Sequence, residues 1–322
     1  MQIMNELTRD IDEVALTLRH FIKEKIAGFK KKGAVIGVSG GVDSAVILAL
    51  CVQELGAENV FGLLLPEKES APSSTVLGEE ICKSLGVEYE EVSISPILEA
   101  LDIYNKKDHI IKRTCPEYDP NIHETALVLP DFLKTGAVNV PYLKLFKNGE
   151  EIAQHRLKAS DYLEIIGLQG VKQRSRMIVQ YMYAEKKNYI VCGATNKTEL
   201  ALGQLVKYGD GGVDIEPMAD CYKTQVYALA KYLNVNEEII KRAPSADTWS
   251  HYTSDQDFYW RMPIEIMDQL LYGKDHKLSL EMIEKNTGLA RETIENALKH
   301  IERVEAATEY IRTAPPTCFI NR

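Results

Sequence analysis

The stretch Val35-Ile36-Gly37-Val38-Ser39-Gly40-Gly41-Val42-Asp43-Ser44 decides the fold class of this chain. Its apolar beginning predicts a buried strand. The two adjacent glycines let the backbone turn tightly and approach a ligand, and the helix that follows would direct its free amide groups to the same point. Ser39 and Ser44 add hydroxyl donors. The stretch therefore predicts a strand-turn-helix unit that binds phosphate.

This turn contains no lysine, so it is not a Walker A loop, which requires G-x-x-x-x-G-K-[ST]. It resembles instead the SGGxDS loop of the PP-loop ATP pyrophosphatases, which cleave ATP between its α and β phosphates and transfer AMP to a substrate. Asp43, at the start of the expected helix, is suitably placed to hold a magnesium ion. In the plainer alternative, Asp43 only stabilises the helix that follows a tight turn.

Strands and helices alternate regularly on both sides of the turn. Strands are expected over 34–38, 60–65 and 87–94, and helices over 43–55 and 74–85. The strands carry unbroken apolar runs, which are typical of parallel strands covered on both faces. A further strand, 189–193, should place a second strand-to-helix edge beside the first. We predict an α/β fold, a doubly wound parallel sheet with helices on both faces, in a single domain that spans residues 1–322.

Other segments depart from this alternation. One amphipathic helix is expected over 7–26. Residues 104–162 contain several X-Pro pairs and a hairpin signal at Asn148-Gly149, and we interpret them as an inserted segment placed to cap the substrate. Residues 264–322 should form a helical tail, with two short amphipathic helices broken at Gly288.

Composition excludes several classes of protein. The 322 residues are 45% hydrophobic and 26% charged, as in ordinary globular proteins, and no apolar run approaches the ~18 residues that span a membrane. The formal net charge of −9 argues against broad binding of nucleic acid. The cysteines form no C-x-x-C pair. We expect core thiols in a reducing compartment, and hence a cytoplasmic protein.

A second polar region follows the expected strand at 189–193. Glu199 lies on the first turn of the next helix, where it can reach the same magnesium ion as Asp43. The plainer interpretation is a capping box between Asn196 and Glu199, and both interpretations can hold together. An alternating set of basic residues precedes this region and would be scattered around a helix, partly in solvent: Lys172, Arg174 and Arg176.

The motifs SGGVDS, QGVKQRSRM, GATNKTEL, KYGDGGVDIEP, CYKTQV and PSADTW, in this order, resemble the motif series of the NAD synthetase family. The resemblance covers about residues 5–100 and 165–250. It implies a homodimeric α/β enzyme that uses ATP and magnesium to amidate nicotinic acid adenine dinucleotide (deamido-NAD) to NAD. The matching positions imply contacts with ATP for Gly37, Ser39, Gly40, Gly41, Asp43, Ser44, Arg174, Thr195 and Lys223, a magnesium site at Asp43 and Glu199, and contacts with deamido-NAD for Lys207, Asp210 and Asp214.

The resemblance also implies the order of the chemistry. The nicotinate carboxylate attacks the α phosphate and releases pyrophosphate, and ammonia then displaces AMP. Asp43, Glu199 and Lys223 would neutralise the phosphate charge, and Asp210 would attract or deprotonate ammonium. The segment before the phosphate turn is too short for a glutaminase domain, so we expect free ammonia or ammonia from a separate glutaminase.

Departures from the family pattern gather where the acceptor should lie. Residues 253–263 replace the Leu-Gly closure of the family's acidic lid with aromatic residues and Arg261. The insert at 104–162 is longer than is typical, and residues 309–316 keep only Arg312 of a basic stretch. These departures favour an alternative, a paralogous PP-loop amide ligase that adenylates another carboxylate and joins it to ammonia or an amine.

Two further alternatives fit the sequence less well. A tRNA-thiolating or lysidine-forming enzyme would need a basic surface, an RNA-binding domain or a catalytic pair of cysteines, and none of these is visible. A non-catalytic nucleotide-binding regulator would tolerate the loss of Asp43 or Glu199, and both are present.

Overall fold

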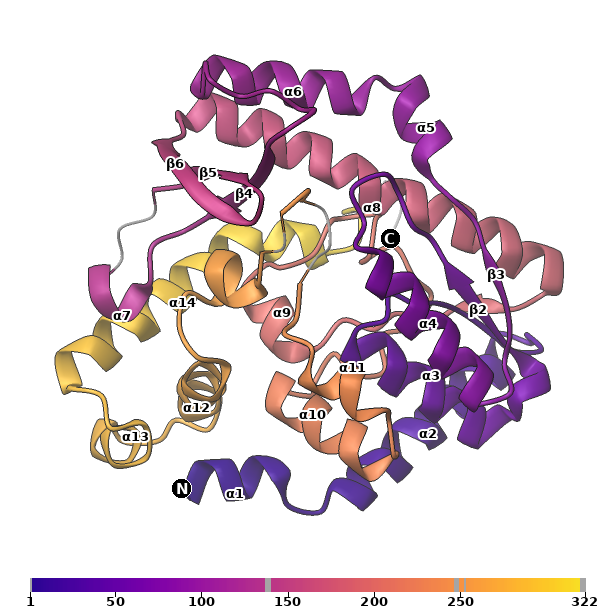
Figure 1. The fold of residues 1–322 in the computed structure, drawn as a ribbon. Coiled ribbons are helices and arrows are strands. Elements are labelled where there is room, and N and C mark those ends of the chain that lie inside the picture. Colours follow the sequence, from indigo (N-terminus) through magenta and orange to yellow (C-terminus); the bar gives the residue numbers. More distant parts are fainter. Residues whose placement is uncertain (1, 137–139, 246–248, 252, 319–322) are drawn as a thin grey trace.

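The computed structural model describes residues 2–136, 140–245, 249–251 and 253–318 (Figure 1). Its central sheet is parallel, with the strand order β3 (Glu88–Glu91), β2 (Val60–Leu64), β1 (Ala34–Gly37), β7 (Ile190–Val191). Ala34 pairs with Val60 on one side and with Ile190 on the other. The predicted second edge therefore does lie beside the phosphate turn. The outer strands β3 and β7 are shorter than the predicted 87–94 and 189–193.

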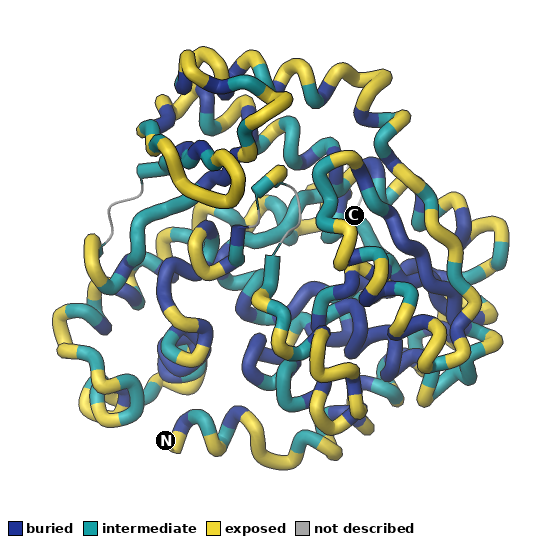
Figure 2. The backbone as a smooth tube through the Cα atoms, viewed as in Figure 1, coloured by how far each residue is buried: buried dark blue, intermediate teal, exposed yellow. Residues whose placement is uncertain are grey.

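Helices cover both faces of this sheet, which confirms the doubly wound fold. One face packs against α2 (Ile11–Gly28), α3 (Val42–Leu55), α4 (Pro72–Ser84) and α10 (Lys223–Tyr232). The other packs against α5 (Ser95–Ala100), α6 (Ile103–Thr114) and α8 (Ala159–Lys187). Every residue of β2 is buried (Figure 2). This confirms the prediction, made from its unbroken apolar run, of a strand covered on both faces.

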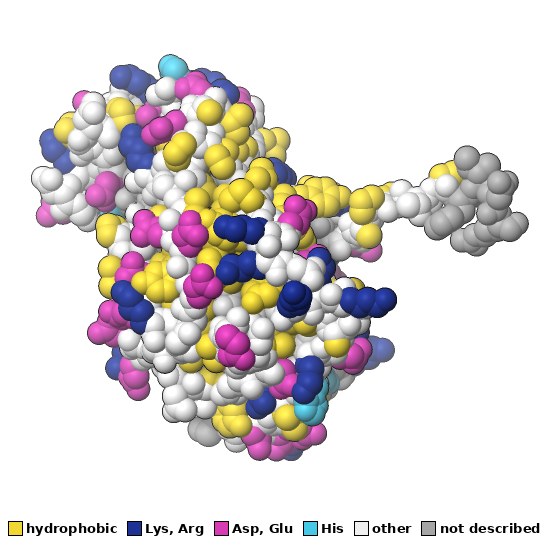
Figure 3. All heavy atoms as spheres, turned by 90° about the vertical axis from the view of Figure 1, so that its right-hand side faces the viewer, with side chains coloured by type: hydrophobic (Ala, Val, Ile, Leu, Met, Phe, Trp, Pro, Cys, Tyr) yellow, Lys and Arg dark blue, Asp and Glu magenta, His cyan; other side chains and the backbone are white. Residues whose placement is uncertain are grey.

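The predicted insert contains a small antiparallel sheet that consists of β4 (Glu124–Val128), β5 (Tyr142–Lys147) and β6 (Glu150–Arg156). A short helix, α7 (Phe132–Thr135), lies between β4 and β5 in the chain. Asn148 and Gly149 have φ angles of 53° and 80°, which confirms the predicted hairpin turn. The predicted limits 104 and 162 fall inside α6 and α8. These two helices carry the small sheet as a lobe at the top of the molecule (Figures 1 and 3).

A layer of helices beside the sheet buries a separate apolar cluster. It consists of α1 (Gln2–Thr8), α12 (Ile264–Asp275), α13 (Leu280–Thr287) and α14 (Arg291–Arg312). The prediction of one N-terminal helix is wrong, because Asp10 adopts a left-handed conformation, φ 54°, and separates α1 from α2. Gly288 does end α13, but α14 is 22 residues long rather than short.

Short elements complete the chain: the 3-10 turn η1 (Ala57–Asn59), α9 (Lys197–Ala201), α11 (Glu237–Lys241) and the π-helical turn η2 (Gln256–Trp260). Among the described residues, no helix combines the length and the apolar character needed to cross a membrane.

Candidate active site

Hydrogen bonds to its own hydroxyl groups stabilise the phosphate turn between β1 and α3. Ser44 Oγ accepts a hydrogen bond from the Ser39 amide at 3.2 Å, and Ser39 Oγ accepts one from the Gly41 amide at 3.3 Å. Gly40 has a φ of 71°, and a Cβ there would lie 2.3 Å from the carbonyl oxygen of Ser74. Only glycine fits this position. The turn is thus preformed for an anion at the start of α3.

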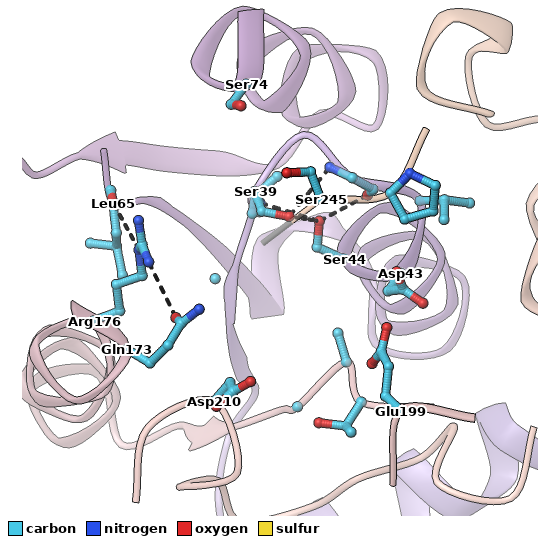
Figure 4. Close-up of a pocket in the computed structure, with 18 of the residues that line it drawn as sticks. Ser39, Asp43, Ser44, Leu65, Ser74, Gln173, Arg176, Glu199, Asp210 and Ser245 are labelled. Carbon is cyan, nitrogen blue, oxygen red and sulfur yellow. Dashed lines mark hydrogen bonds between the residues drawn. The ribbon is translucent and has the colours of Figure 1, made fainter. Parts of the chain in front are cut away.

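Two carboxylates converge beside this turn, from the first turns of α3 and α9. Asp43 and Glu199 point toward each other (Figure 4), and Lys223 Nζ, at the start of α10, donates to Asp43 Oδ2 and, at 3.1 Å, to Glu199 Oε1. Asn196 donates to Asp43 Oδ1 at 2.9 Å and forms a capping box with Glu199. The capping interpretation of Glu199 is therefore confirmed, and Glu199 also lies beside Asp43, while the shared magnesium site stays a prediction.

Burial decides the electrostatics of this cluster. It raises the pKa of Glu199 to about 8, although Lys223 opposes that rise and Asp43 adds to it. For Lys223, burial by itself lowers the pKa, but the facing carboxylates outweigh burial and the pKa is raised. Lys223 is thus a cation at neutral pH. Two converging carboxylates are a donor set that suits a hard divalent cation, so the residues present fit magnesium.

A buried aspartate on α12 fixes the helices that carry Glu199 and Lys223. Asp268 accepts hydrogen bonds from Thr198 Oγ1 at 2.6 Å and from the Thr224 amide at 2.7 Å. Thr198 Oγ1 in turn accepts one from the Lys223 amide at 3.0 Å. Sequence reasoning missed Asp268, because no motif marks it and it lies far along the chain from the residues that it holds.

The turn opens on a cavity of about 320 Å³. Of the predicted site residues, those that line it are Gly37, Ser39, Gly41, Asp43, Ser44, Thr195, Glu199 and Asp210. Of the three basic residues singled out on α8, Arg176 lines the cavity, and it donates to the Leu65 carbonyl at 3.1 Å and to Gln173 Oε1 at 3.2 Å (Figure 4). The predicted Arg174 does not line this cavity; its Nε donates to the Lys207 carbonyl at 3.2 Å.

Two predicted substrate residues also lie away from the cavity lining. Lys207 Nζ donates to the carbonyl oxygens of Tyr310 and Thr313, at 2.7 and 3.1 Å, near the end of α14. Asp214 accepts from the Val191 amide at 2.8 Å and from Tyr181 OH at 3.1 Å, and so holds the end of β7. Their roles in substrate binding remain predictions.

Two half-buried carboxyl groups lie at the cavity, Asp210 in its lining and Glu216 against the lining residue Thr195. Burial raises the pKa of Asp210 to about 6, even though its carboxylate accepts from the Val206 amide at 2.6 Å. Glu216 accepts from the amide and the hydroxyl of Thr195, at 3.1 and 3.0 Å, and burial raises the pKa of Glu216 to about 8. Sequence reasoning missed Glu216, although it lies in the KYGDGGVDIEP motif.

The altered lid segment, 253–263, faces the cavity with Asp255 and Tyr259. Of the motif PSADTW, Ser245 lines the cavity, whereas residues 246–248 lie outside the described residues. No described residue of the insert lines the cavity. The insert contacts the lid instead, so its described residues do not form the direct cap over the substrate that the sequence predicts.

Backbone groups form most of the contact between insert and lid. The Leu129 amide donates to the Asp257 carbonyl at 2.9 Å, and the Phe132 amide donates to the Arg261 carbonyl at 2.7 Å. Arg261 Nε donates to the Pro130 carbonyl at 2.8 Å. The lid is therefore held in place by the segment that follows β4.

Comparison with known proteins identifies the relatives of this chain. The family model of NAD synthase matches residues 14–115 and 138–315. The NH(3)-dependent NAD(+) synthetase of Mesorhizobium japonicum is 33% identical over 306 residues, with 95% of each chain covered. That of Thermotoga maritima is 37% identical over 301 residues, 94% of this chain and 98% of the relative.

Solved structures agree on the fold. An NMN synthetase from Francisella tularensis superposes with a TM-score of 0.67 at 22% identity, over 96% of this chain and 98% of that one. The NH3-dependent NAD synthetase from Campylobacter jejuni superposes with a TM-score of 0.63 at 24% identity, over 96% and 99%.

Proposed function

We propose that this chain, which belongs to the NAD synthase family, is an ammonia-dependent NAD synthetase, an ATP-dependent ligase that forms AMP. ATP adenylates the nicotinate carboxylate of deamido-NAD and releases pyrophosphate, and ammonia then displaces AMP to give NAD. The observation that carries the proposal is the convergence of Asp43, Glu199 and Lys223 beside a preformed phosphate turn. The whole chain, 1–322, acts as one synthetase domain.

Adenylation uses the charges at the turn. The amides and hydroxyl groups of the turn bind the phosphates of ATP, with Gly40 allowing the turn to pack closely against Ser74. Lys223, held as a cation, stabilises the charge that develops on the departing pyrophosphate. Thr195 lies along the same wall, where Glu216 fixes its hydroxyl group. Gly37 at the end of β1 completes the floor of this ATP pocket.

Magnesium is the metal that the donor set fits. Asp43 and Glu199 would hold it, and when bound it supplies positive charge opposite the phosphate oxygens. Glu199 would hold the ion as its charged carboxylate, and Lys223 would face the phosphates of ATP.

The acceptor side of the cavity carries the second step. Asp210 lies in the glycine-rich segment 207–214, and its raised pKa, about 6, leaves it mostly charged at neutral pH but a stronger base than an ordinary aspartate. It attracts ammonium and takes a proton as ammonia attacks the acyl-adenylate. Arg174, Lys207 and Asp214 serve the nucleotides from outside the described cavity, Arg174 on the ATP side and the other two around deamido-NAD.

A direct assay tests the proposal. The purified protein is incubated with ATP, magnesium, ammonium and deamido-NAD, and NAD, AMP and pyrophosphate are followed by mass spectrometry. NAD and AMP in equal amounts support the proposal. Formation of AMP and pyrophosphate only with another carboxylate would instead support the alternative, a paralogous amide ligase. The lid that carries Tyr259 and Arg261 is the feature that favours this second candidate.

We further propose that the enzyme is a cytoplasmic homodimer supplied with free ammonia or by a separate glutaminase. Exposed apolar side chains on α8 support the dimer: Leu163 at 67% exposed, Ile178 at 57% and Met182 at 55%. The double variant Ile178→Glu, Met182→Glu should sediment as a monomer. Val76→Glu, on the exposed side of α4, is the matched control and should leave the dimer intact. A dimer that survives the double variant would rule out this face.

A further inference from the structure

A group of metal-ligating side chains lies in the upper lobe, away from the active-site cavity. Cys115, Glu117 and His155 place one donor atom each, a thiol sulfur, a carboxylate oxygen and a ring nitrogen, within 4.8 Å of one another. Cys115 is buried, His155 is half-buried and Glu117 is exposed. Within the group, the Cys115 thiol therefore lies in the apolar core of the lobe, and the Glu117 carboxylate faces solvent.

Rigid elements bring these residues together. Cys115 is the C-cap of α6, where Pro116 ends the helix, and the Tyr118 amide donates to the Cys115 carbonyl at 3.0 Å to close a turn that brings Glu117 back beside the thiol. Tyr118 OH donates to Asp108 at 2.7 Å and fixes that turn against α6. His155 lies on β6, in register with Leu143 of β5. The convergence therefore does not depend on a flexible loop.

The contacts do not have the order of a nucleophilic triad, in which the imidazole lies between the thiol and the carboxylate. Here Glu117 contacts both other groups, with Oε1 2.7 Å from His155 Nε2 and a hydrogen bond with the Cys115 thiol. A carboxylate between thiol and imidazole suits a shared cation better than a proton relay. Thiolate and carboxylate together carry two negative charges, which balance a divalent ion, and a sulfur-nitrogen-oxygen set favours zinc over magnesium or calcium.

We infer that Cys115, Glu117 and His155 form a binding site for a divalent transition metal of the zinc class. Binding displaces the thiol proton to solvent, and water supplies the remaining tetrahedral position. The ion ties the end of α6, one of the two helices that carry the lobe, to β6 within the lobe. Of the three residues, only Glu117 lies in the stretch 116–137 that the family model does not match; Cys115 ends one matched range and His155 lies in the other.

The alternative is that Cys115 is an ordinary core thiol beneath a surface ion pair. Cobalt(II) separates the two, because a cysteine ligand gives it a sulfur-to-metal charge-transfer band that oxygen and nitrogen ligands alone do not. The untagged full-length protein, treated with chelator and then kept in excess magnesium to fill the Asp43–Glu199 site, is titrated with cobalt and then with zinc.

The expected result is a charge-transfer band that saturates at one equivalent of cobalt per chain and disappears as zinc displaces it. Cys115→Ser should abolish the band. Cys115 is buried, so Cys115→Ser could also disturb folding, and a second variant, His155→Gln, is made at the half-buried ligand. His155→Gln should weaken zinc binding by more than about 100-fold, because the loss of an outer-shell partner already costs up to about 100-fold. Zinc should also raise the melting temperature of the wild type but not of His155→Gln.

Cys318→Ser removes the exposed thiol near the C-terminus and is the matched control, in which the band should persist. Absence of a band in the folded wild type, or a band that follows Cys318 rather than Cys115, would overturn the proposal. Zinc affinity equal in the wild type and in His155→Gln would overturn it as well.

Discussion

The carboxyl edge of the parallel sheet and the lid with its supporting lobe lie on two sides of one cavity but are built differently. At the sheet edge, each functional side chain comes from the first turn of a helix: Asp43 on α3, Glu199 on α9 and Lys223 on α10. The lid contributes Asp255 and Tyr259 from an irregular segment that the insert holds largely through backbone groups. The chemical identity of each side chain should therefore matter more at the sheet edge than in the insert. A backbone contact tolerates substitution, whereas a buried ion cluster does not.

The largest effect is expected from breaking the sheet edge. Asp43→Asn and Glu199→Gln should each lower the rate of ATP-dependent pyrophosphate release by at least about 100- to 1,000-fold, because each removes a carboxylate that would hold magnesium against the phosphates. Release is followed in single-turnover experiments, with circular dichroism as a check on folding. Asp220→Asn, an acid 95% exposed that pairs with Lys197, is the control and should retain activity. Full activity in either active-site variant would refute the two-carboxylate site.

Asp268→Ala should damage the same edge indirectly. It removes the acceptor shared by Thr198 and the Thr224 amide, so we expect a loss of about 3 kcal/mol in the free energy of unfolding and a lower kcat. Glu265→Ala, at an exposed position of the same helix, should change neither. Urea denaturation gives the stability, and assays below the unfolding range give kcat. A destabilised variant with normal kcat would show that Asp268 supports the fold without positioning Lys223 or Glu199.

The contrast between the two regions also explains what the sequence could reveal. The turn, the parallel strands and the capping box of Asn196 and Glu199 depend on local patterns, so the sequence predicts them, with nearly correct limits for β1 and β2 and limits that are too wide for β3 and β7. Asp268 and Glu216 act across the tertiary structure: no motif marks Asp268, and the KYGDGGVDIEP motif that contains Glu216 does not reveal its contact with Thr195. Arg176 was not separated from Arg174, because a basic run on a helix does not reveal which residue faces a cavity before the packing of α8 is known.

The lid should respond differently from the sheet edge. Arg261→Met removes the hydrogen bonds to the Pro130 and Gly136 carbonyls, so the lid loses its anchor while the phosphate turn is untouched. We expect KM for the carboxylate acceptor to rise about tenfold and KM for ATP to stay within a factor of about two. Steady-state kinetics with each substrate varied in turn measures both.

Arg291→Met, which breaks only the exposed pair with Glu281, is the matched control for Arg261→Met. It should leave both KM values unchanged. If Arg261→Met instead altered KM for ATP and spared the acceptor, the lid would belong to the nucleotide half of the cavity, and the proposed division of labour between the two regions would be wrong.

The smallest effect concerns pH and the sheet edge alone. Burial raises the pKa of Glu216 from 4.5 to about 8, so the folded state holds a proton that the unfolded state releases at lower pH. Its contribution to stability is present in full below pH 4.5 and is lost as the pH rises toward 8. Glu216→Gln stays neutral and should escape this loss. Because water still reaches part of the side chain, we expect the variant to gain about 1–3 kcal/mol relative to the wild type between pH 5 and pH 8.

Chemical denaturation at a series of pH values measures that difference, and Glu151→Gln on the hairpin of the lobe is the control. Glu151 is partly exposed and pairs with Lys144 on the neighbouring strand, so its replacement should not change the pH dependence in this direction. A Glu216→Gln profile parallel to the wild type would mean that Thr195 is held by a charged carboxylate. In that case the wall of the cavity would carry one more negative charge, and the ATP pocket would depend more strongly on Lys223 and magnesium for its neutrality.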